Sequence, residues 1–328
     1  MRNRMHKQTF SQGYKQFDCS RLELSSLEQR KSDLNLNDIL DLEWKGKISP
    51  VFLTVGKQIA QAIKLGSIVI LMMGGHVIRS GVQRFIIDMM EKGFISCLAM
   101  NGAGVIHDFE FALHGQTTES VSRYISCGQF GLWKETGRIN DIVTKGAKEG
   151  LGLGEAVGKA ILEQNVPNRE ISLLAEAYRM KIPATVHVGI GYDIIHQLPN
   201  FEGWAYGETS HKDFLRFAHA MEGIENGVVM NFGSAVMAPE VYLKALSMVR
   251  NVARQEKRSV CHFTTLVCDL QDLPEDFSKE ADKETPGYYF RPWKTMLVRT
   301  VMDGGQGYYV RGKHAETIPQ LWSAVVRK

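Results

Sequence analysis

The sequence predicts an α/β fold in which a doubly wound, mostly parallel sheet carries helices on both faces and is preceded by an N-terminal helical arm. Residues 67–114 give the observations that predict it. A short apolar run at 67–73 is typical of a strand buried on both faces. Apolar residues then recur at helical spacing over 77–90, and a second apolar run follows at 94–100. Strand, helix and strand in this order form a βαβ unit, and such units build parallel sheets.

The rest of the chain supplies the other strands of this sheet and the helices that cover it. An amphipathic stretch at 52–65 predicts a helix that leads into the first strand, and the polar chain before it has a helix-like pattern at 34–42. We therefore divide the chain into an arm at 1–45 and one domain at 46–328. Further helices are predicted at 106–113, 171–180, 213–221, 239–254 and 317–326, further strands at 184–188, 227–231 and 259–267, a helix-rich region from 117 to 165 and an acidic loop at 269–287.

Composition describes an ordinary globular protein and argues against several classes. Hydrophobic residues make up 44% and charged residues 23% of the 328-residue chain, which is long enough to bury a large core. The formal net charge of +3 is too small to indicate nucleic acid or a membrane surface as a partner. The five cysteines form no CxxC pair, and neither a secretory pattern nor an apolar run of membrane-span length is present. We therefore expect a cytoplasmic protein with reduced thiols.

Four glycine-bearing turns follow four of the predicted parallel strands. The carboxyl ends of parallel strands meet at one edge of a sheet, where ligands bind in open α/β folds. Glycine lets a backbone approach a ligand closely, and helix amino ends after such turns offer N–H groups to phosphate. One turn would carry little weight because βα loops need glycine anyway, but four in register predict a Rossmann-like nucleotide cleft. The turns are Gly74-Gly75, Gly102-Ala-Gly104, Gly189-Ile-Gly191 and Phe232-Gly233-Ser234.

Residues 151–159 look like a phosphate loop but break its pattern. The spacing fails, Ala160 stands where serine or threonine belongs, and no predicted strand precedes the segment. We interpret these residues as the start of a helix whose small side chains allow close packing.

Histidine and aspartate residues near the same turns suggest a second hypothesis. His76 follows the first turn, His107 and Asp108 follow the second, and His187 and Asp193 flank the third. Such side chains can hold a hydrolytic metal ion. The sequence has no HxH or HExxH pair, however, and a lone histidine beside a cleft is more often a hydrogen-bonding residue. A metal-assisted hydrolase therefore stays an alternative, and we expect no metal.

The most acidic stretch of the chain precedes an aromatic cluster that contains a lysine. Residues 269–284 contain seven acidic residues and two lysines. Such a run is typical of a solvated loop, but it could also form an acidic entrance to the site for a cationic substrate. Tyr288-Tyr-Phe-Arg-Pro-Trp293-Lys294 follows. A lysine desolvated beside aromatic rings has a lowered pKa and can form an imine, although its stem can equally lie on a tryptophan.

Several motifs of the chain match, in order, motifs of one known family. Gly74-Gly75-His76 and the helix start at 79–83 stand where that family has Thr-Ser-Asn and Ser-Ser-Gly-Ile-Arg. The segment 101–108 is similar to its Thr-Ala-Gly-Gly-Val-Glu-Glu-Asp, 188–193 to its Asp-Gly-Ser-Leu-Gly-Asp, 232–234 to its glycine-triplet strand end, and Trp293-Lys294 to its Trp-Gly-Lys. On these motifs, residues 50–328 resemble the deoxyhypusine synthase family.

The resemblance implies an NAD-dependent aminobutyl transferase that acts on spermidine or a related polyamine through a lysine imine. The acceptor would be a protein lysine or a small amine, as in homospermidine formation, and the enzyme would be a homotetramer with active sites between subunits. The implied catalytic residues are Lys294 and His107, and the implied substrate-binding residues are Asp269, Asp272, Glu275, Asp276 and Trp293. The implied NAD-binding residues are Gly74, Gly75, His76, Ser80, Asn101, Gly102, Ala103, Gly104, Asp108, Gly189, Gly191, Gly233 and Ser234.

The sequence departs from the family pattern at positions that carry the family's chemistry. The family's basic histidine falls at Ala238-Pro239, its paired glutamates fall at Ile106 and His107, and its ribose-binding aspartate falls near Val188. Trp293-Lys294 also lacks the intervening glycine. A non-catalytic nucleotide-binding subunit, whose lysine would not react, is therefore a further alternative.

Overall fold

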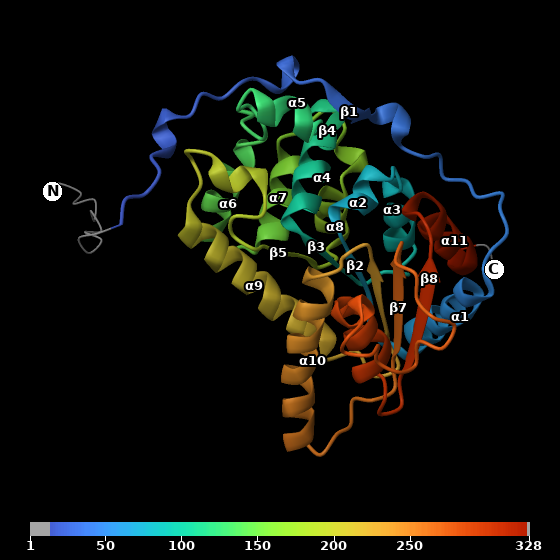
Figure 1. Ribbon diagram of the computed structural model, residues 1–328. Helices are drawn as coiled ribbons and strands as arrows, with labels where there is room; N and C mark the ends of the chain where they lie inside the picture. Colours follow the sequence, from blue (N-terminus) through green and yellow to red (C-terminus); the bar gives the residue numbers. More distant parts are fainter. Residues whose placement is uncertain (1–13, 327–328) are drawn as a thin grey trace.

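The computed structural model describes residues 14–326, and at its centre lies a six-stranded sheet whose neighbouring strands are all parallel (Figure 1). Helices cover both faces, so the predicted fold class is confirmed. The strand order is β5-β3-β2-β6-β7-β8, and it reverses direction between β2 and β6. Such a switch point is where doubly wound sheets bind ligands. The strands are β2 (Val69–Met73), β3 (Cys97–Asn101), β5 (Ala184–His187), β6 (Val228–Phe232), β7 (Thr264–Asp269) and β8 (Gln306–Arg311).

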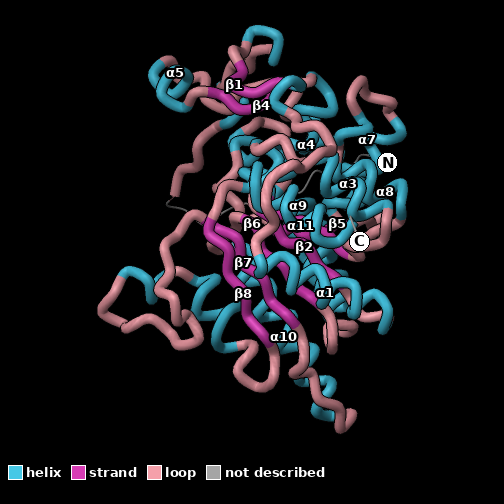
Figure 2. The backbone as a smooth tube through the Cα atoms, turned by 90° about the vertical axis from the view of Figure 1, so that its right-hand side faces the viewer, coloured by secondary structure: helices cyan, strands magenta, loops and turns pink. Residues whose placement is uncertain are grey.

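The central strands are apolar throughout because helices bury both of their faces. Every residue of β2 and β6 is buried, as are the first four residues of β3. Continuous apolar runs of this kind are what the sequence shows, so these strands lie close to their predicted positions. The strand predicted at 259–267 begins later, at Thr264. β8 lies at the edge of the sheet (Figure 2). It was not predicted, because its residues are half-buried or exposed and form no apolar run.

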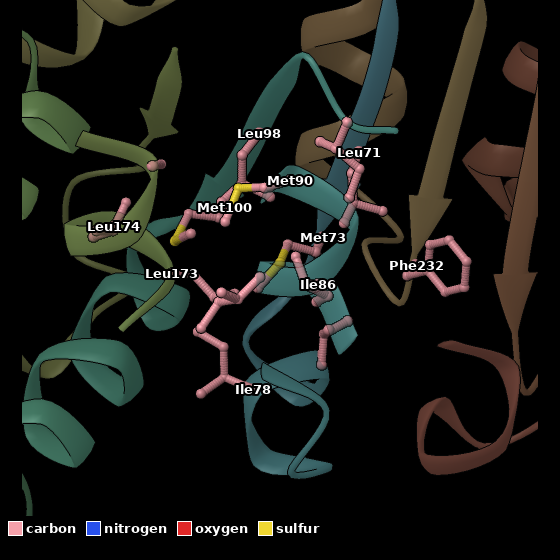
Figure 3. Close-up of a cluster of buried hydrophobic side chains, with 14 of the residues drawn as sticks. Leu71, Met73, Ile78, Ile86, Met90, Leu98, Met100, Leu173, Leu174 and Phe232 are labelled. Atoms are coloured by element: carbon pink, nitrogen blue, oxygen red, sulfur yellow. The ribbon is translucent and has the colours of Figure 1, made fainter. Parts of the chain in front are cut away.

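Alternate residues of the strands enter two hydrophobic layers. Leu71 and Met73 of β2 pack in a layer with α1, α3, α4, α8 and α11, part of which is drawn in Figure 3. Ile70 and Met72 face the other layer, which contains α9, α10 and a π-helix. The helices are α1 (Pro50–Leu65), α2 (Gly75–Arg79), α3 (Gln83–Glu91), α4 (Gly102–His114), α5 (Val121–Ser126), α6 (Arg138–Lys148), α7 (Leu153–Glu163), α8 (Leu173–Met180), α9 (Gly203–Met221), α10 (Met237–Gln255), α11 (His314–Val326) and the π-helix Trp293–Arg299. Short 3-10 helices lie at Cys19–Arg21, Leu27–Gln29, Leu36–Asp38, Arg169–Ile171, Ile194–Gln197 and Pro286–Tyr289.

Two local predictions near the first glycine turns need correction. The helix predicted over 77–90 is divided into α2 and α3, because Gly81 adopts a φ of +71° between them. The second glycine turn is the first turn of α4, since Asn101 caps that helix by accepting a hydrogen bond from Gly104 N at 3.1 Å. The helix therefore starts directly at the end of β3.

The described part of the arm packs on its own chain and runs over the carboxyl edge of the sheet (Figure 1). Its strand β1 (Ser32–Asn35) pairs antiparallel with β4 (Gln116–Glu119). The helix-like stretch expected at 34–42 contains only the 3-10 helix Leu36–Asp38, and its first residues belong to β1. Residues 117–120, expected to precede a helical pattern, lie mostly in β4 and are followed by α5. Residues 1–13 of the predicted arm lie outside the described residues.

Arg30 anchors the arm in the domain. Its guanidinium donates two hydrogen bonds of 2.8 Å to Glu110 of α4, and both side chains are 1% exposed. Glu110 also accepts from the hydroxyls of Thr117 (2.7 Å) and Thr136 (2.6 Å). Burial raises the pKa of Glu110, but the hydrogen bond and charge of Arg30, with the two hydroxyls, outweigh it and leave the pKa below its ordinary value.

Asp213 of α9 covers the free edge of β5. One of its oxygens accepts hydrogen bonds from Val186 N of β5 and from Gly154 N of α7, both at 2.9 Å. A side-chain acceptor here keeps an edge strand from recruiting another chain. Gly154 lies in the first turn of α7, which agrees with the interpretation of 151–159 as a helix start. Among the described residues, no helix is both long and apolar enough to cross a membrane.

We predict that Arg30→Met lowers the free energy of unfolding by about 3–5 kcal/mol, because it leaves the carboxylate of Glu110 buried without its cation. Since the pKa of Glu110 is depressed in the folded state, the stability that the ion pair adds is present above the ordinary glutamate pKa and is lost as the pH falls through the folded value. Denaturant unfolding at neutral pH measures the loss. The double variant Arg30→Met/Glu110→Leu should be less destabilised than the single variant, and equal destabilisation would contradict the assignment.

Candidate functional site

The turns after β2 and β6 lie in contact at the switch point. Gly74 N donates to Phe232 O and Gly233 N donates to Cys268 O, both at 3.0 Å. A side chain at Gly74 would collide with the carbonyl oxygen of Gly233, and Gly233 itself has a φ of +64°. These two glycines therefore allow the turns to pack against each other.

A cavity of about 230 Å³ lies beside this edge, between α4, β4 and the loop after β5. We call it the His107 pocket. Of the predicted site residues, it brings together His107 and Ala103 with Asp193 of the metal hypothesis. It is lined by Arg30, Arg79, Ala103, Ile106, His107, Glu110, Thr118, Glu119, Val121, Phe130, Tyr192, Asp193 and Ile194.

A chain of hydrogen bonds fixes the imidazole of His107. Thr117 donates its hydroxyl hydrogen to Glu110 at 2.7 Å, so the oxygen of Thr117 can only accept from His107 Nδ1, which lies 2.8 Å away. His107 therefore carries its proton on Nδ1, and Nε2 keeps a free lone pair. Burial lowers the pKa of His107 to about 4; the charge of Glu110 opposes this effect, and the charge of Arg79 adds to it. The imidazole is neutral at physiological pH, with one nitrogen able to accept a proton.

Asp193 is the pocket's other ionisable group of note. Burial raises its pKa to about 6. Its Oδ2 lies 3.8 Å from His196 Nε2, and its carboxylate fills the space beside Gly102, where a side chain on that glycine would collide with it. A carboxylate next to a neutral imidazole is suited to hold an ammonium group.

Most of the remaining predicted cofactor residues contact other groups of the chain, and Gly191 has open space. Ser80 Oγ donates to the carbonyl oxygen of His76 at 2.8 Å, and the ring of Tyr192 fills the space at Gly189. Gly191 has open space around it and a φ of +96°. Asp108 is 1% exposed and accepts from Ser172 Oγ, Leu173 N and Leu174 N at 2.6–3.1 Å, so its carboxylate caps α8 and does not face the cleft.

Lys294 lies on the opposite face of the sheet from α4. It is 5% exposed and belongs to the π-helix that packs with α10, and its Nζ lies 3.8 Å from the centre of the Tyr288 ring. Among the described residues no carboxylate lies within 4.0 Å of this ammonium. Trp293 Nε1 donates to Phe277 O at 2.9 Å. One chain therefore does not bring Lys294 to the His107 pocket.

The predicted substrate acids are dispersed. Asp269 accepts from Leu270 N and Gln271 N at 2.7 and 3.2 Å, and Asp272 pairs with Arg311 at 3.1 Å. Asp276 accepts from the hydroxyl and the amide of Ser278, and Glu275 is exposed. Asp269 is the half-buried last residue of β7, while Asp272, Glu275 and Asp276 are exposed in the loop that follows.

The five residues of the metal hypothesis do not form one site, because some of them have hydrogen-bond partners elsewhere. Asp108 caps α8, and His187 Nε2 pairs with Thr185 Oγ1 at 3.0 Å. Across residues 14–326, no group of three or more His, Cys, Asp or Glu side chains is arranged to hold a metal ion.

Sequence reasoning missed the residues that orient His107 and one histidine near the switch point. Arg30, Glu110 and Thr117 are single polar residues without a motif, and only the fold shows that they meet. His314 begins α11 after the unpredicted strand β8, and its ring fills the space at Gly233. Burial lowers the pKa of His314 to about 4, with Asp269 opposing that effect.

No protein-family model and no curated protein matches the chain. Similar solved structures exist at low identity. Unliganded AgrE has a TM-score of 0.51 and 13% identity, covering 88% of this chain and 34% of AgrE. A protein assigned as LOR/SDH from Methanococcus maripaludis S2 has a TM-score of 0.50 and 16% identity, covering 87% of this chain and 72% of that one.

A protein assigned as a deoxyhypusine synthase from Entamoeba histolytica is more distant, with a TM-score of 0.40 and 10% identity over 80% of this chain and 76% of its own. At that TM-score the likeness carries no argument about this chain. The chain spans 34% of the length of AgrE, so the activities of that longer protein do not transfer to it. Together, the first two likenesses show that the chain has the α/β fold of these proteins.

Proposed function

We propose that this protein is an NAD-dependent enzyme that acts on a small amine, with His107 as the base that accepts the proton of the amine. The observation that carries the proposal is the neutral imidazole whose Nε2 is left free in a small cavity beside the switch point. Oxidation at a carbon that bears nitrogen requires the nitrogen lone pair, so the substrate ammonium must first lose a proton. The imidazole of His107 is neutral at physiological pH, so the lone pair on its Nε2 is available to accept that proton.

The residues of the carboxyl edge fit a dinucleotide. The amides of Gly102 and Ala103 lie in the first turn of the 13-residue helix α4, where an α-helix has no carbonyl acceptor for them. Helix amino ends attract phosphate, and the switch point is the place at which dinucleotides cross such sheets. Gly74, Gly75, His76 and Ser234 border the same place. When bound, NAD would accept a hydride from the substrate carbon.

The chain's own side chains would orient the substrate and move one proton. Asp193 would hold the substrate ammonium, and His107 Nε2 would take the proton from that nitrogen. Glu110 would stabilise the imidazolium through Thr117, because its carboxylate stays ionised beside Arg30. A cavity of about 230 Å³ admits a small amine and excludes a macromolecule from contact with the imidazole.

The finer proposal is aminobutyl transfer from spermidine or a related polyamine, with Lys294 as the nucleophile that forms the imine. The burial of Lys294 against Tyr288, without a nearby carboxylate among the described residues, supports a special role for its amine. Since Lys294 covers the other face of the sheet, this reaction requires the active site to be shared between subunits, as expected for a homotetramer. The acceptor would be a protein lysine or a small amine.

We expect His107→Gln to reduce turnover by about 10²–10⁴-fold, the usual loss when a general base is removed. The measurement is reduction of NAD by the purified protein with spermidine or basic amino acids. The carboxylate of Asp193, whose pKa is raised to about 6, must be ionised to hold the ammonium, so the rate should begin to fall as the pH drops through about 6. It should fall further as the pH approaches 4, where His107 becomes protonated. Full activity of a folded His107→Gln variant would refute the proposal.

We expect Gly102→Val to weaken NAD binding at least tenfold, since a side chain there approaches the Asp193 Cγ to 2.8 Å and blocks the first turn of α4. Calorimetric titration with NAD measures the affinity. Gly207→Val is a matched control, because Gly207 is also helical and has open space where a side chain would lie. Unchanged affinity in folded Gly102→Val would remove the cofactor from this edge.

We expect borohydride to trap a four-carbon fragment on Lys294 after incubation with NAD and spermidine. Peptide mass analysis locates the adduct, and Lys294→Arg, which keeps the charge but cannot form an imine, should show none. NAD reduction without an adduct, or an adduct on another lysine, would leave Lys294 a packing residue and end the transfer proposal.

A further inference from the structure

Arg79 places a cation in the His107 pocket without a counter-ion. It is the last residue of α2, and its Nη1 lies 3.1 Å from His76 Nε2. Among the described residues no carboxylate lies within 4.0 Å of the guanidinium, and its Nε is buried without a hydrogen-bond partner. A buried donor without an acceptor is costly, so the unmet N–H calls for an acceptor from outside the chain.

Thr118 carries a second unmet polar group in the same pocket. Its hydroxyl is buried and, within the described chain, has no hydrogen-bond partner. Its φ is +68°, a strained backbone conformation for a β-branched residue. The neighbouring side chains are in use: Thr117 binds Glu110, while Glu119 accepts from Gly131 N at 3.0 Å and Trp133 Nε1 at 2.9 Å. Strain of this kind persists where a function needs the side chain in that place.

The charge of Arg79 acts on the two neighbouring histidines. After burial, the charge of Arg79 is the next influence that lowers the pKa of His76, and it also lowers that of His107. Both carboxylate oxygens of Glu119 are occupied, and Asp193 lies more than 4.0 Å from the guanidinium. The carboxylates of Glu110, Glu119 and Asp193 line the same pocket, but among the described residues none of them pairs directly with the Arg79 guanidinium.

We infer that Arg79 and Thr118 form an oxyanion-binding subsite of the His107 pocket, which takes one carboxylate or phosphate group of the ligand. The guanidinium supplies Nε and Nη donors in a fork that matches an oxyanion, and the threonine hydroxyl supplies a third donor. The inference depends on the proposed function only for the identity of the ligand that carries the oxyanion. The oxyanion has two possible sources there: a phosphate of the dinucleotide, or a carboxylate on the amine substrate.

The experiment uses histidine-labelled full-length protein and follows the His107 ring by NMR, with His107→Gln used to assign its signal. Inorganic phosphate and acetate are titrated separately, first alone and then with NAD present. Bound anion should move the His107 signal and raise the pH at which the ring titrates, because it offsets the charge of Arg79. Arg79→Met should weaken the binding of the effective anion at least tenfold, as expected for a lost charge-assisted hydrogen bond.

Two further variants separate binding from folding. Thr118→Gly removes the hydroxyl and also the backbone strain, so it should bind the anion more weakly while its unfolding temperature stays equal or rises. Arg84→Met is the matched control, because Arg84 pairs with Asp41 at the surface and lies outside the pocket. It should bind as the unsubstituted protein does.

The outcomes distinguish the two sources. Phosphate binding that NAD abolishes assigns the subsite to the cofactor, and acetate binding that persists with NAD assigns it to a substrate carboxylate. No response of His107 to either anion, or a response that Arg79→Met and Thr118→Gly leave unchanged, overturns the inference. Because none of these readouts needs turnover, the subsite can fail while the base role of His107 stands, and the reverse also holds.

Discussion

The buried ion pair between Arg30 and Glu110 links the arm, α4 and the pocket. Net stabilisation from such a pair is small, since desolvation of both charges opposes their attraction. Its larger effect is on geometry: Glu110 stays ionised, so Thr117 must donate to it, and His107 must in turn donate from Nδ1. Arg30, 80 positions before Glu110 in the sequence, thereby helps to determine which nitrogen of the His107 imidazole faces the ligand. The arm is thus part of the candidate site.

How much of the fold could be predicted depends on how completely each element is buried. β2, β3 and β6 lie between two helical layers, so their apolar runs are unambiguous in the sequence. β8 is an edge strand with mixed burial, and β1 and β4 form a two-stranded ribbon whose residues alternate in exposure. Short half-exposed strands give the same weak pattern as loops or helix turns. The pairing of β1 with β4 depends on the arm docking on the domain, and β8 pairs with β7 of the central sheet, so local sequence encodes neither partner.

The site was only partly predictable because the glycine turns have two explanations that the sequence cannot separate. Glycine turns of this kind predict room for a ligand, and in the structure they do mark the carboxyl edge of the sheet. In the structure the space at Gly74, Gly102 and Gly233 is filled by Gly233 O, the Asp193 carboxylate and the His314 ring. Glycine is therefore needed at these positions largely because neighbouring turns and side chains pack against them. The groups left without partners, on Arg79 and Thr118, come from segments that only the fold brings together.

Lys294 and His107 differ in whether a single chain completes the site around the side chain. His107 has one satisfied nitrogen and one free nitrogen in a cavity, which is a complete arrangement for a base in a single chain. Lys294 is 5% exposed and lies on the Tyr288 ring. Such a cation–π contact contributes roughly 0.5–2 kcal/mol, while complete burial of an ammonium costs several kcal/mol. If Lys294 had only a packing role, methionine or leucine would fill the same space without this desolvation free energy. A reactive role would explain the lysine, but its place on the other face of the sheet means that a second subunit must complete that chemistry.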